Sequence, residues 1–242
     1  MRIPLNQKNI KLALGLLYLI IIFFVLYFFL SKFNYKDFTS YKFIQLNSDY
    51  LISFKEKNIM LISFLLIIFT ILWVLLLGFG TPIALVGGFI FGKWLGTFLV
   101  VLSLTVGSSL LYIIALYFFK SIVIEVFSKK FGYLENKFKK QELIIMIIYR
   151  IVGLVPFAIA NILPTLFNVK LKNYFLGTMI GITPSIFIMT SLGSGLENII
   201  SLNSEMPSLI KIITFEEIYI PIIGFIIFFI LVFFIKSKFT AK

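Results

Sequence analysis

The sequence has neither cysteine nor histidine among its 242 residues. Without cysteine there is no disulfide, no thiolate metal site and no cysteine nucleophile. The absence of histidine removes the commonest general base, metal ligand and proton relay. Acidic residues are also scarce, with 10 Asp and Glu against 22 Lys and Arg. Most enzyme classes are therefore disfavoured, and we expect no catalytic residue, no metal and no cofactor.

Charge of either sign is scarce too. Charged residues make up 13% of the chain, about half the share typical of soluble domains. Hydrophobic residues make up 60%, and the mean hydropathy is +1.08. These values predict an integral membrane protein. The net charge of +12 lies mainly in lysines of short segments between apolar runs, which favours topology determinants and attraction to anionic lipid over a nucleic-acid site.

The apolar residues fall into six runs, at 12–30, 59–77, 81–119, 143–169, 172–192 and 216–235. The first follows a basic stretch, but it is too long for a signal peptide and lacks a small-residue cleavage site, so we interpret it as a retained anchor helix. The run at 81–119 is too long for one span. The stretch GFGTPIALVGGFIFGKWLG (78–96) is so rich in glycine that it predicts broken, non-helical backbone.

Lysine positions predict how these runs meet the membrane. If 59–77 and 143–163 both crossed it, the basic segment 120–142 would lie outside, against the positive-inside rule. If 59–96 instead enters and returns from outside, and 143–169 from inside, that segment and both termini are cytoplasmic. The predicted fold is therefore an all-α polytopic membrane protein, an inverted repeat with two opposed re-entrant hairpins and spanning helices.

This topology divides the chain into three parts. We expect an N-terminal anchor helix with an external loop at 1–58, a core at 59–195, and an external loop with a C-terminal anchor helix at 196–242. The core is predicted to comprise a hairpin at 59–96, a span at 97–119, a cytoplasmic amphipathic linker at 120–142, a hairpin at 143–169 and a span at 172–192. The linker alternates lysines with apolar residues, which favours an interfacial helix over a solvated connector.

The two predicted hairpins have similar endings, KWLGT (93–97) and YFLGT (174–178). A proline precedes each ending at nearly the same distance, Pro82 before Gly96 and Pro164 before Gly177. Inverted repeats of this kind are the usual architecture of secondary transporters.

The motifs resemble a known family. The pattern R-x5-P-x4-N in YRIVGLVPFAIAN (149–161), followed by KNYFLGTMIGITPS (172–185), resembles the second half of the DedA-like proteins, also called SNARE-associated Golgi or VTT-domain proteins. The stretch GFGTPIALVGGFIFGKWLGT (78–97), then TVGSSLLYIIA (105–115), is similar to the glycine-rich hairpin of their first half. The resemblance covers about residues 59–195.

The family resemblance implies two opposed re-entrant hairpins and movement of lipids, phospholipid or undecaprenyl phosphate, between leaflets. The sequence departs from the family pattern in two ways. Gly153 stands where a second proline is common, and Thr81 and Pro82 stand where the first hairpin of proton-linked members carries acidic residues. We therefore expect no acidic proton relay.

Arg150 is the leading candidate for a binding residue. It lies eight residues beyond Glu142, about 12 Å along a helix and so near the middle of an apolar layer about 30 Å thick. A charge at that depth needs a partner. Three interpretations stay open: the guanidinium receives a lipid phosphate, caps the carbonyls of a broken helix, or snorkels to the cytoplasmic face.

The other candidates are glycines, prolines and small polar residues near the predicted hairpin tips. Those assigned to substrate binding with Arg150 are Gly153, Pro156, Asn161, Gly80, Pro82, Gly87 and Gly88. For these glycines and prolines, a kink that serves helix packing is the competing interpretation. For Asn161, a structural hydrogen bond is favoured over ligand contact. Those assigned to close helix packing are Gly96, Thr97, Gly107, Gly177, Thr178, Gly181 and Pro184.

These features predict a lipid transporter or scramblase of the bacterial inner membrane that moves a phosphate-bearing lipid, phospholipid or polyprenyl phosphate, with both termini cytoplasmic. Its expected partners are membrane lipids and not nucleic acid, and a homo-oligomer is compatible with the sequence. Two alternatives remain: an ion-coupled transporter of a small anionic solute, and a non-transporting assembly or trafficking partner.

Overall fold

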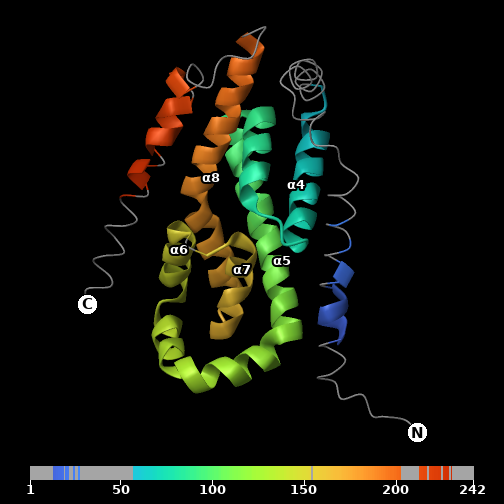
Figure 1. Cartoon of the computed structure of the whole chain (residues 1–242), viewed down its shortest axis with the longest axis vertical. Coiled ribbons are helices and arrows are strands. Elements are labelled where there is room, and N and C mark those ends of the chain that lie inside the picture. Colours follow the sequence, from blue (N-terminus) through green and yellow to red (C-terminus); the bar gives the residue numbers. More distant parts are fainter. Residues whose placement is uncertain are drawn as a thin grey trace.

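The described part of the chain is helical throughout. The computed structural model describes residues 57–153 and 155–202, with parts of 13–27 and 213–230; side chains at 119–140 lie outside the described part. Its main elements are α4 (Ile59–Leu75), α5 (Gly80–Lys140), α6 (Glu142–Val152), α7 (Phe157–Ile162), the 3-10 helix η1 (Leu163–Phe167) and α8 (Leu171–Leu202) (Figure 1). The all-α prediction is thus confirmed for these residues. The predicted N-terminal anchor helix with its loop at 1–58, and the predicted loop with its anchor helix at 196–242, fall largely outside them. Residues 196–202, predicted to begin that second loop, belong to α8 instead.

Helix α5 is not one straight rod. A Cβ placed on Gly96 would lie 2.5 Å from the carbonyl oxygen of Gly87. Nine residues of straight helix would separate these positions by about 13.5 Å. The reversal occurs at Gly92, whose φ of 74° suits glycine because it has no Cβ. Helix α5 therefore has a first limb at 80–91 that rises beside α4, and a second limb that descends from 93 (Figure 1).

The prediction of broken backbone across 78–96 is wrong for most of that stretch. Apart from the reversal at Gly92, non-helical backbone is confined to 76–79, and the helix resumes at Gly80. Pro82 is tolerated because it lies in the first turn, where its missing N–H would have had no helical partner. Gly88 is helical and serves a close contact instead: a Cβ there would lie 2.0 Å from the carbonyl oxygen of Thr190.

A second hairpin enters from the opposite end of the molecule (Figure 1). Helix α6 ends at Gly153, which adopts a left-handed φ of 58° and donates its N–H to the carbonyl of Tyr149. Pro156 then begins α7 in extended geometry, with φ −50° and ψ 138°. The return through α7 and η1 ends at Asn168, with φ 49°, after which α8 begins. Below, the first hairpin means α4 with the first limb of α5, and the second hairpin means α6, α7 and η1.

The two hairpins turn at the same intervals. Positive φ occurs in the described residues at Leu77, Gly92, Gly153 and Asn168, in that order along the chain. The interval from Leu77 to Gly92 equals the interval from Gly153 to Asn168. In each hairpin the first of the pair forms the tip, and the second joins the returning limb to the long helix that follows.

Helix α8 holds both hairpins. Near its C-terminal end, a Cβ on Gly193 would lie 2.1 Å from the carbonyl oxygen of Leu85 in the first limb. Near its N-terminal end, a Cβ on Gly177 would lie 2.5 Å from the Cβ of Met146 in α6. Pro184 lies inside the helix between these two contacts.

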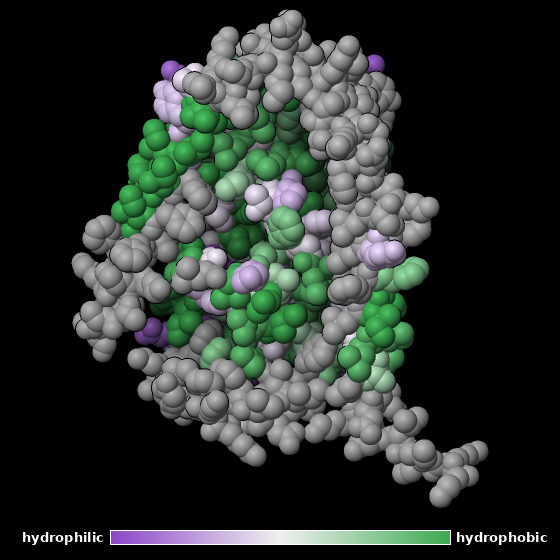
Figure 2. Space-filling view, in the orientation of Figure 1, coloured by the Kyte–Doolittle hydropathy of each residue, from purple (hydrophilic) through white to green (hydrophobic). Residues whose placement is uncertain are grey.

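Two helices have the length and composition to cross a membrane, Gly80–Phe118 and Leu171–Ile200. The first includes the reversal at Gly92, so its crossing segment is the second limb of α5. Figure 2 shows apolar residues over most of the described surface, with a group of polar residues around a hollow at the centre of this face.

Candidate functional site

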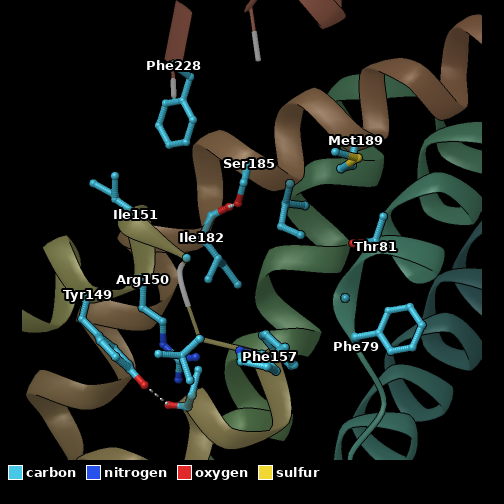
Figure 3. Close-up of a pocket in the computed structure, with 16 residues that line it drawn as sticks. Phe79, Thr81, Tyr149, Arg150, Ile151, Phe157, Ile182, Ser185, Met189 and Phe228 are labelled. Carbon is cyan, nitrogen blue, oxygen red and sulfur yellow. Dashed lines mark hydrogen bonds between the residues drawn. The ribbon is translucent and has the colours of Figure 1, made fainter. Parts of the chain in front are cut away.

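The tips of the two hairpins line one pocket of about 430 Å³. Phe79, Gly80 and Thr81 line it from the first tip, and seven residues line it from the second: Tyr149, Arg150, Ile151, Gly153, Val155, Pro156 and Phe157. Ile182 and Ser185 of α8 close another side (Figure 3). Segments that are far apart in the chain therefore share one cavity.

Arg150 is the charged residue among the side chains that line this pocket. It is only 6% exposed. Its Nε donates to the Oγ1 of Thr178 at 3.1 Å, and its Nη2 donates to the hydroxyl of Tyr174 at 2.7 Å. The guanidinium thus bonds side chains of α8 inside the protein. With these two bonds, the guanidinium neither extends to the cytoplasmic face nor caps the carbonyls of a helix.

Tyr174 extends the contact to other elements. Its hydroxyl donates towards the main-chain oxygen of Asn161 at 3.2 Å, and its ring stacks on Tyr112 with centroids 4.3 Å apart. The hydroxyl of Tyr112 in turn donates to the carbonyl of Val169 at 2.6 Å. The network from Arg150 to Val169 therefore links α6, α8, α7 and α5 across the second hairpin.

The charge of Arg150 has aromatic and hydroxyl neighbours but no carboxylate partner in the described residues. Its guanidinium carbon lies 5.3 Å from the ring centroid of Tyr174 and 5.9 Å from those of Tyr149 and Phe157. Such cation–π contacts compensate a buried cation only partly. Its two hydrogen bonds occupy two of the five N–H donors that a guanidinium carries. The site can therefore accept an anion with several oxygens.

The buried carboxylate of Glu142 interacts with a different part of the structure. It is 7% exposed, and its Oε2 accepts from the backbone N–H of Lys170 at 3.2 Å and from Asn173 Nδ2 at 2.6 Å. This carboxylate meets the N-terminus of α8, where the helix dipole favours negative charge. It lies eight residues before Arg150 on α6, about 12 Å along the helix. It stabilises the start of α8 and leaves Arg150 unneutralised.

The structure brings together half of the residues that the sequence assigned to substrate binding. Gly80, Gly153 and Pro156 line the pocket with Arg150. Asn161 is fully buried behind it, bonded to Tyr174. The remaining three, Pro82, Gly87 and Gly88, lie outside the pocket lining.

The residues assigned to packing lie mostly at helix contacts. A Cβ on Gly181 would lie 2.5 Å from the Cβ of Arg150, and one on Gly107 would lie 3.0 Å from the Cβ of Val74. Gly96 and Gly177 meet the first limb of α5 and α6, as described above. Thr97 shares a hydrogen bond of 2.6 Å with Thr190. Pro184 lines an apolar groove between α5 and α8.

Sequence reasoning missed three functional contacts. Thr178, assigned to packing, bonds Arg150, and Tyr174 and Tyr112 were given no role. A signal for the first two was present, because Tyr174 and Thr178 are four residues apart and so share one face of a helix. Tyr112 had no such signal, since it lies far along the chain from Tyr174, its stacking partner.

Residues 78–195, which run from the first hairpin tip to the last turns of α8, match the VTT domain. The chain carries a VTT domain. The family resemblance seen in the sequence is thereby confirmed, and the two helices long and apolar enough to cross a membrane agree with a membrane protein.

Two curated relatives extend this VTT-domain match. The chain is similar to a transmembrane protein 41 homolog of Dictyostelium discoideum, with 26% identity over 173 residues, covering 69% of this chain and 49% of that protein. It is also similar to a transmembrane protein 41 homolog of Caenorhabditis elegans, with 27% identity over 153 residues, covering 60% of this chain and 61% of that protein. The chain thus spans about half to three-fifths of the length of these relatives. No solved structure matches.

Proposed function

We propose that this protein moves a phosphate-bearing lipid, a phospholipid or a polyprenyl phosphate, between the two leaflets, with the phosphate passing Arg150. The observation that carries this proposal is a buried guanidinium, without a carboxylate partner in the described residues, on the wall of the pocket where both hairpin tips meet.

The physical reason is the cost of a lone buried charge. An ion without a counter-ion in a low-dielectric interior is unfavourable, and a phosphate in the pocket supplies the opposite charge. The planar fork of arginine matches two phosphate oxygens at once. Much of the rest of the lining, including Phe79, Phe157 and Ile182, is apolar and suits the carbon atoms next to a headgroup.

We further propose that both hairpins are re-entrant and that the two halves form an inverted repeat. Their entry from opposite ends in Figure 1 and the equal spacing of their turns support this. The positive-inside rule then puts segment 120–142 and both termini in the cytoplasm, in the inner membrane of a bacterium. In this cysteine-free chain, Lys93→Cys and Lys130→Cys should react with an impermeant thiol reagent from opposite sides. Labelling of both from one side contradicts this topology.

Reconstitution in liposomes tests the function. Fluorescent phospholipid or polyprenyl phosphate should become accessible to an external quencher in vesicles that contain the protein. We expect Arg150→Ala to slow this movement about 10- to 100-fold, the value of one or two charge-assisted hydrogen bonds. Arg150→Lys should keep part of the rate, because it retains the charge and loses the planar fork.

Lys93→Ala is the matched control, since it removes an exposed cation outside the Arg150 pocket. Its rate should equal that of the unsubstituted protein. A folded Arg150→Ala variant with full lipid movement overturns the proposal.

A pocket of about 430 Å³ also has room for a small anion without acyl chains, which favours a second candidate, transport of a soluble anionic solute. Uptake of radiolabelled phosphate into the same vesicles, without lipid movement, identifies it. Absence of both activities, with a protein that co-purifies, points to the third candidate, a non-transporting assembly partner.

A further inference from the structure

Five polar side-chain atoms are buried in the described core without a hydrogen-bond partner there. They belong to Thr105, Ser108 and Ser109 of α5, to Asn161 of α7, through its Nδ2, and to Thr165 of η1. The exposed fraction of each residue is between 0 and 8%. Since buried polar groups are bonded in the great majority of cases, five such atoms in one region need an explanation.

The orientation of the α5 hydroxyls is unusual for this protein. Serine and threonine inside a helix normally donate to the carbonyl of the preceding turn. Thr70, Thr183 and Ser191 do so, at 2.6–2.7 Å. So does Ser103, two residues before Thr105, at 2.7 Å. The hydroxyls of Thr105, Ser108 and Ser109 do not, so they are aimed away from their own helix.

Two features indicate where these hydroxyls point. Residues 105, 108, 109 and 112 recur at the spacing of one helix face. Gly107, by contrast, faces α4, where it meets Ile71 and Val74. Helix α5 also contacts α7 and η1. The polar face of α5 therefore lies on the side of the second hairpin.

The bond from Tyr112 to Val169 fixes the register between these elements. The second limb of α5 and the α7–η1 segment both descend in Figure 1, so residues earlier in each lie at corresponding heights. Ser109, Ser108 and Thr105 precede Tyr112 by three to seven residues, about 4.5–10.5 Å along the helix. Thr165 and Asn161 precede Val169 by four and eight residues. The five unpartnered atoms thus come from facing segments at the same level.

We propose that these five groups form a buried water-binding site between α5 and the second hairpin. Water fits because hydroxyls both donate and accept, whereas Asn161 Nδ2 only donates, and a water molecule can meet both demands. A cation is disfavoured by Arg150, which joins the same network through Tyr174 and Asn161, and by the absence of a carboxylate from the five residues. An anion is disfavoured because both recorded bonds of Arg150 go to Tyr174 and Thr178 rather than to this group.

The water site extends the network of Arg150 into the protein. Asn161 belongs to both, because its main-chain oxygen and its Oδ1 accept from the Tyr174 hydroxyl, at 3.2 and 3.4 Å, while its Nδ2 is unpartnered. Water held by the five residues therefore orients Asn161, and Asn161 orients the hydroxyl that receives Arg150. Thr105, Ser108, Ser109 and Thr165 are positioning residues in this arrangement, and the site does not depend on what Arg150 binds.

Transfer of magnetisation from water protons to threonine carbons tests the site directly. The full chain, labelled with ¹³C-threonine, is measured by solid-state NMR in phosphatidylcholine–phosphatidylglycerol bilayers. We expect transfer to Thr105 and Thr165 to be several-fold faster than to Thr70 and Thr190, which are equally buried but bonded within their own helix. Equal rates at all four residues overturn the proposal.

Two further measurements separate water from the alternatives. Replacing sodium chloride with N-methylglucamine gluconate should leave the transfer to Thr105 and Thr165 unchanged; a change with either ion assigns the site to that ion and overturns it. Thr165→Val should slow transfer to Thr105 by at least about half, because the two residues share water, whereas Thr70→Val should not. No effect of Thr165→Val on Thr105 would also contradict a shared site.

Discussion

The two hairpins have the same backbone path but carry different side chains at equivalent positions. Val74 and Arg150 each lie three residues before a positive-φ tip, at Leu77 and Gly153. Each packs on a glycine of the long helix that follows, Val74 on Gly107 and Arg150 on Gly181. One position holds a fully buried valine and the other a buried guanidinium. Since the valine supports the same turn, this path of the chain does not require a charge.

The tips of the two hairpins differ in the same way, with apolar packing at the first and a charged residue at the second. At the first tip, Trp73 covers Gly78 with its ring and donates from Nε1 to the carbonyl of Phe79 at 3.0 Å. At the second tip, Gly153 and Pro156 line the pocket and Arg150 lies on its wall. Both tips therefore reach the same cavity, but only the second brings a charged side chain to it among the described residues.

The largest effect is expected when the residue types at these two equivalent positions, 74 and 150, are exchanged. Val74→Arg places a charge against Gly107 and the apolar residues around α4, and should cost about 3–5 kcal/mol of unfolding free energy. Arg150→Val should change that free energy by less than about 2 kcal/mol, because an apolar replacement removes the cost of a buried charge. Thermal unfolding in detergent measures both.

Lipid movement supplies the second half of that test. Arg150→Val should abolish it while the protein stays folded, and Val74→Ala should preserve it in spite of a loss of about 2 kcal/mol from two buried carbon atoms. Equal destabilisation by Val74→Arg and Arg150→Val would show that Arg150 is a structural residue like its counterpart.

Close contacts with α8 should be the next most sensitive. Gly88→Ala puts a methyl group 2.0 Å from a main-chain oxygen of Thr190, and we expect a cost of about 3 kcal/mol or more because neither backbone can move alone. Gly224→Ala is the control, since no heavy atom lies within 4 Å of the added Cβ. Circular dichroism melts compare the two. A neutral Gly88→Ala would mean that the first limb does not dock on α8 as described.

The tyrosine pair should give a smaller, graded effect. Tyr174→Phe keeps the ring stack on Tyr112 but removes the hydroxyl that accepts from Arg150, and should cost about 1.5–3 kcal/mol. Tyr112→Phe removes a neutral bond to Val169 and should cost about 1 kcal/mol. We expect lipid movement to fall about tenfold in the first variant, following the loss of one such bond. Equal effects of the two variants would argue against a special role for the bond to Arg150.

Substitution of the two turn glycines should give the smallest difference between the two hairpins. Gly92→Ala and Gly153→Ala each force alanine into a left-handed conformation, with φ of 74° and 58°, at a cost of about 1–2 kcal/mol. No neighbouring heavy atom lies closer than 3.8 Å to either added Cβ, so conformation alone should set the value. Melting temperatures that fall by the same amount would sharpen the equivalence of the two hairpins, and a loss in one variant alone would weaken it.

The sequence predicted the second hairpin better than the first, for a local reason. Gly153 and Pro156 both disfavour continued helix, and the structure breaks there. In the stretch 78–96 the glycines suggested irregular backbone, but Gly87 and Gly88 are helical and face neighbouring segments at close range. Composition alone does not distinguish a glycine that ends a helix from one that lets two helices approach.

Other features of the site required tertiary structure. Leu77 adopts a left-handed φ that its residue type disfavours, so the signal for the first tip comes from the glycines that follow, Gly78 and Gly80, and not from residue 77 itself. Arg150 was identified as a buried charge from its depth, but its partners Tyr174 and Thr178 lie on a different helix, far along the chain. Sequence indicates that such a charge needs neighbours, whereas packing decides which ones it has.

Pro184 gives α8 a mechanical role. A proline has no N–H, so the helix lacks the backbone bond that residue 184 would donate to residue 180. That missing bond spans residues 180–184, after Gly177, which docks α6, and before Thr190 and Gly193, which dock the first limb of α5. Gly181, which packs on Arg150, lies within this turn. A bend at this point therefore changes both the angle between the hairpins and the contact of Gly181 with Arg150.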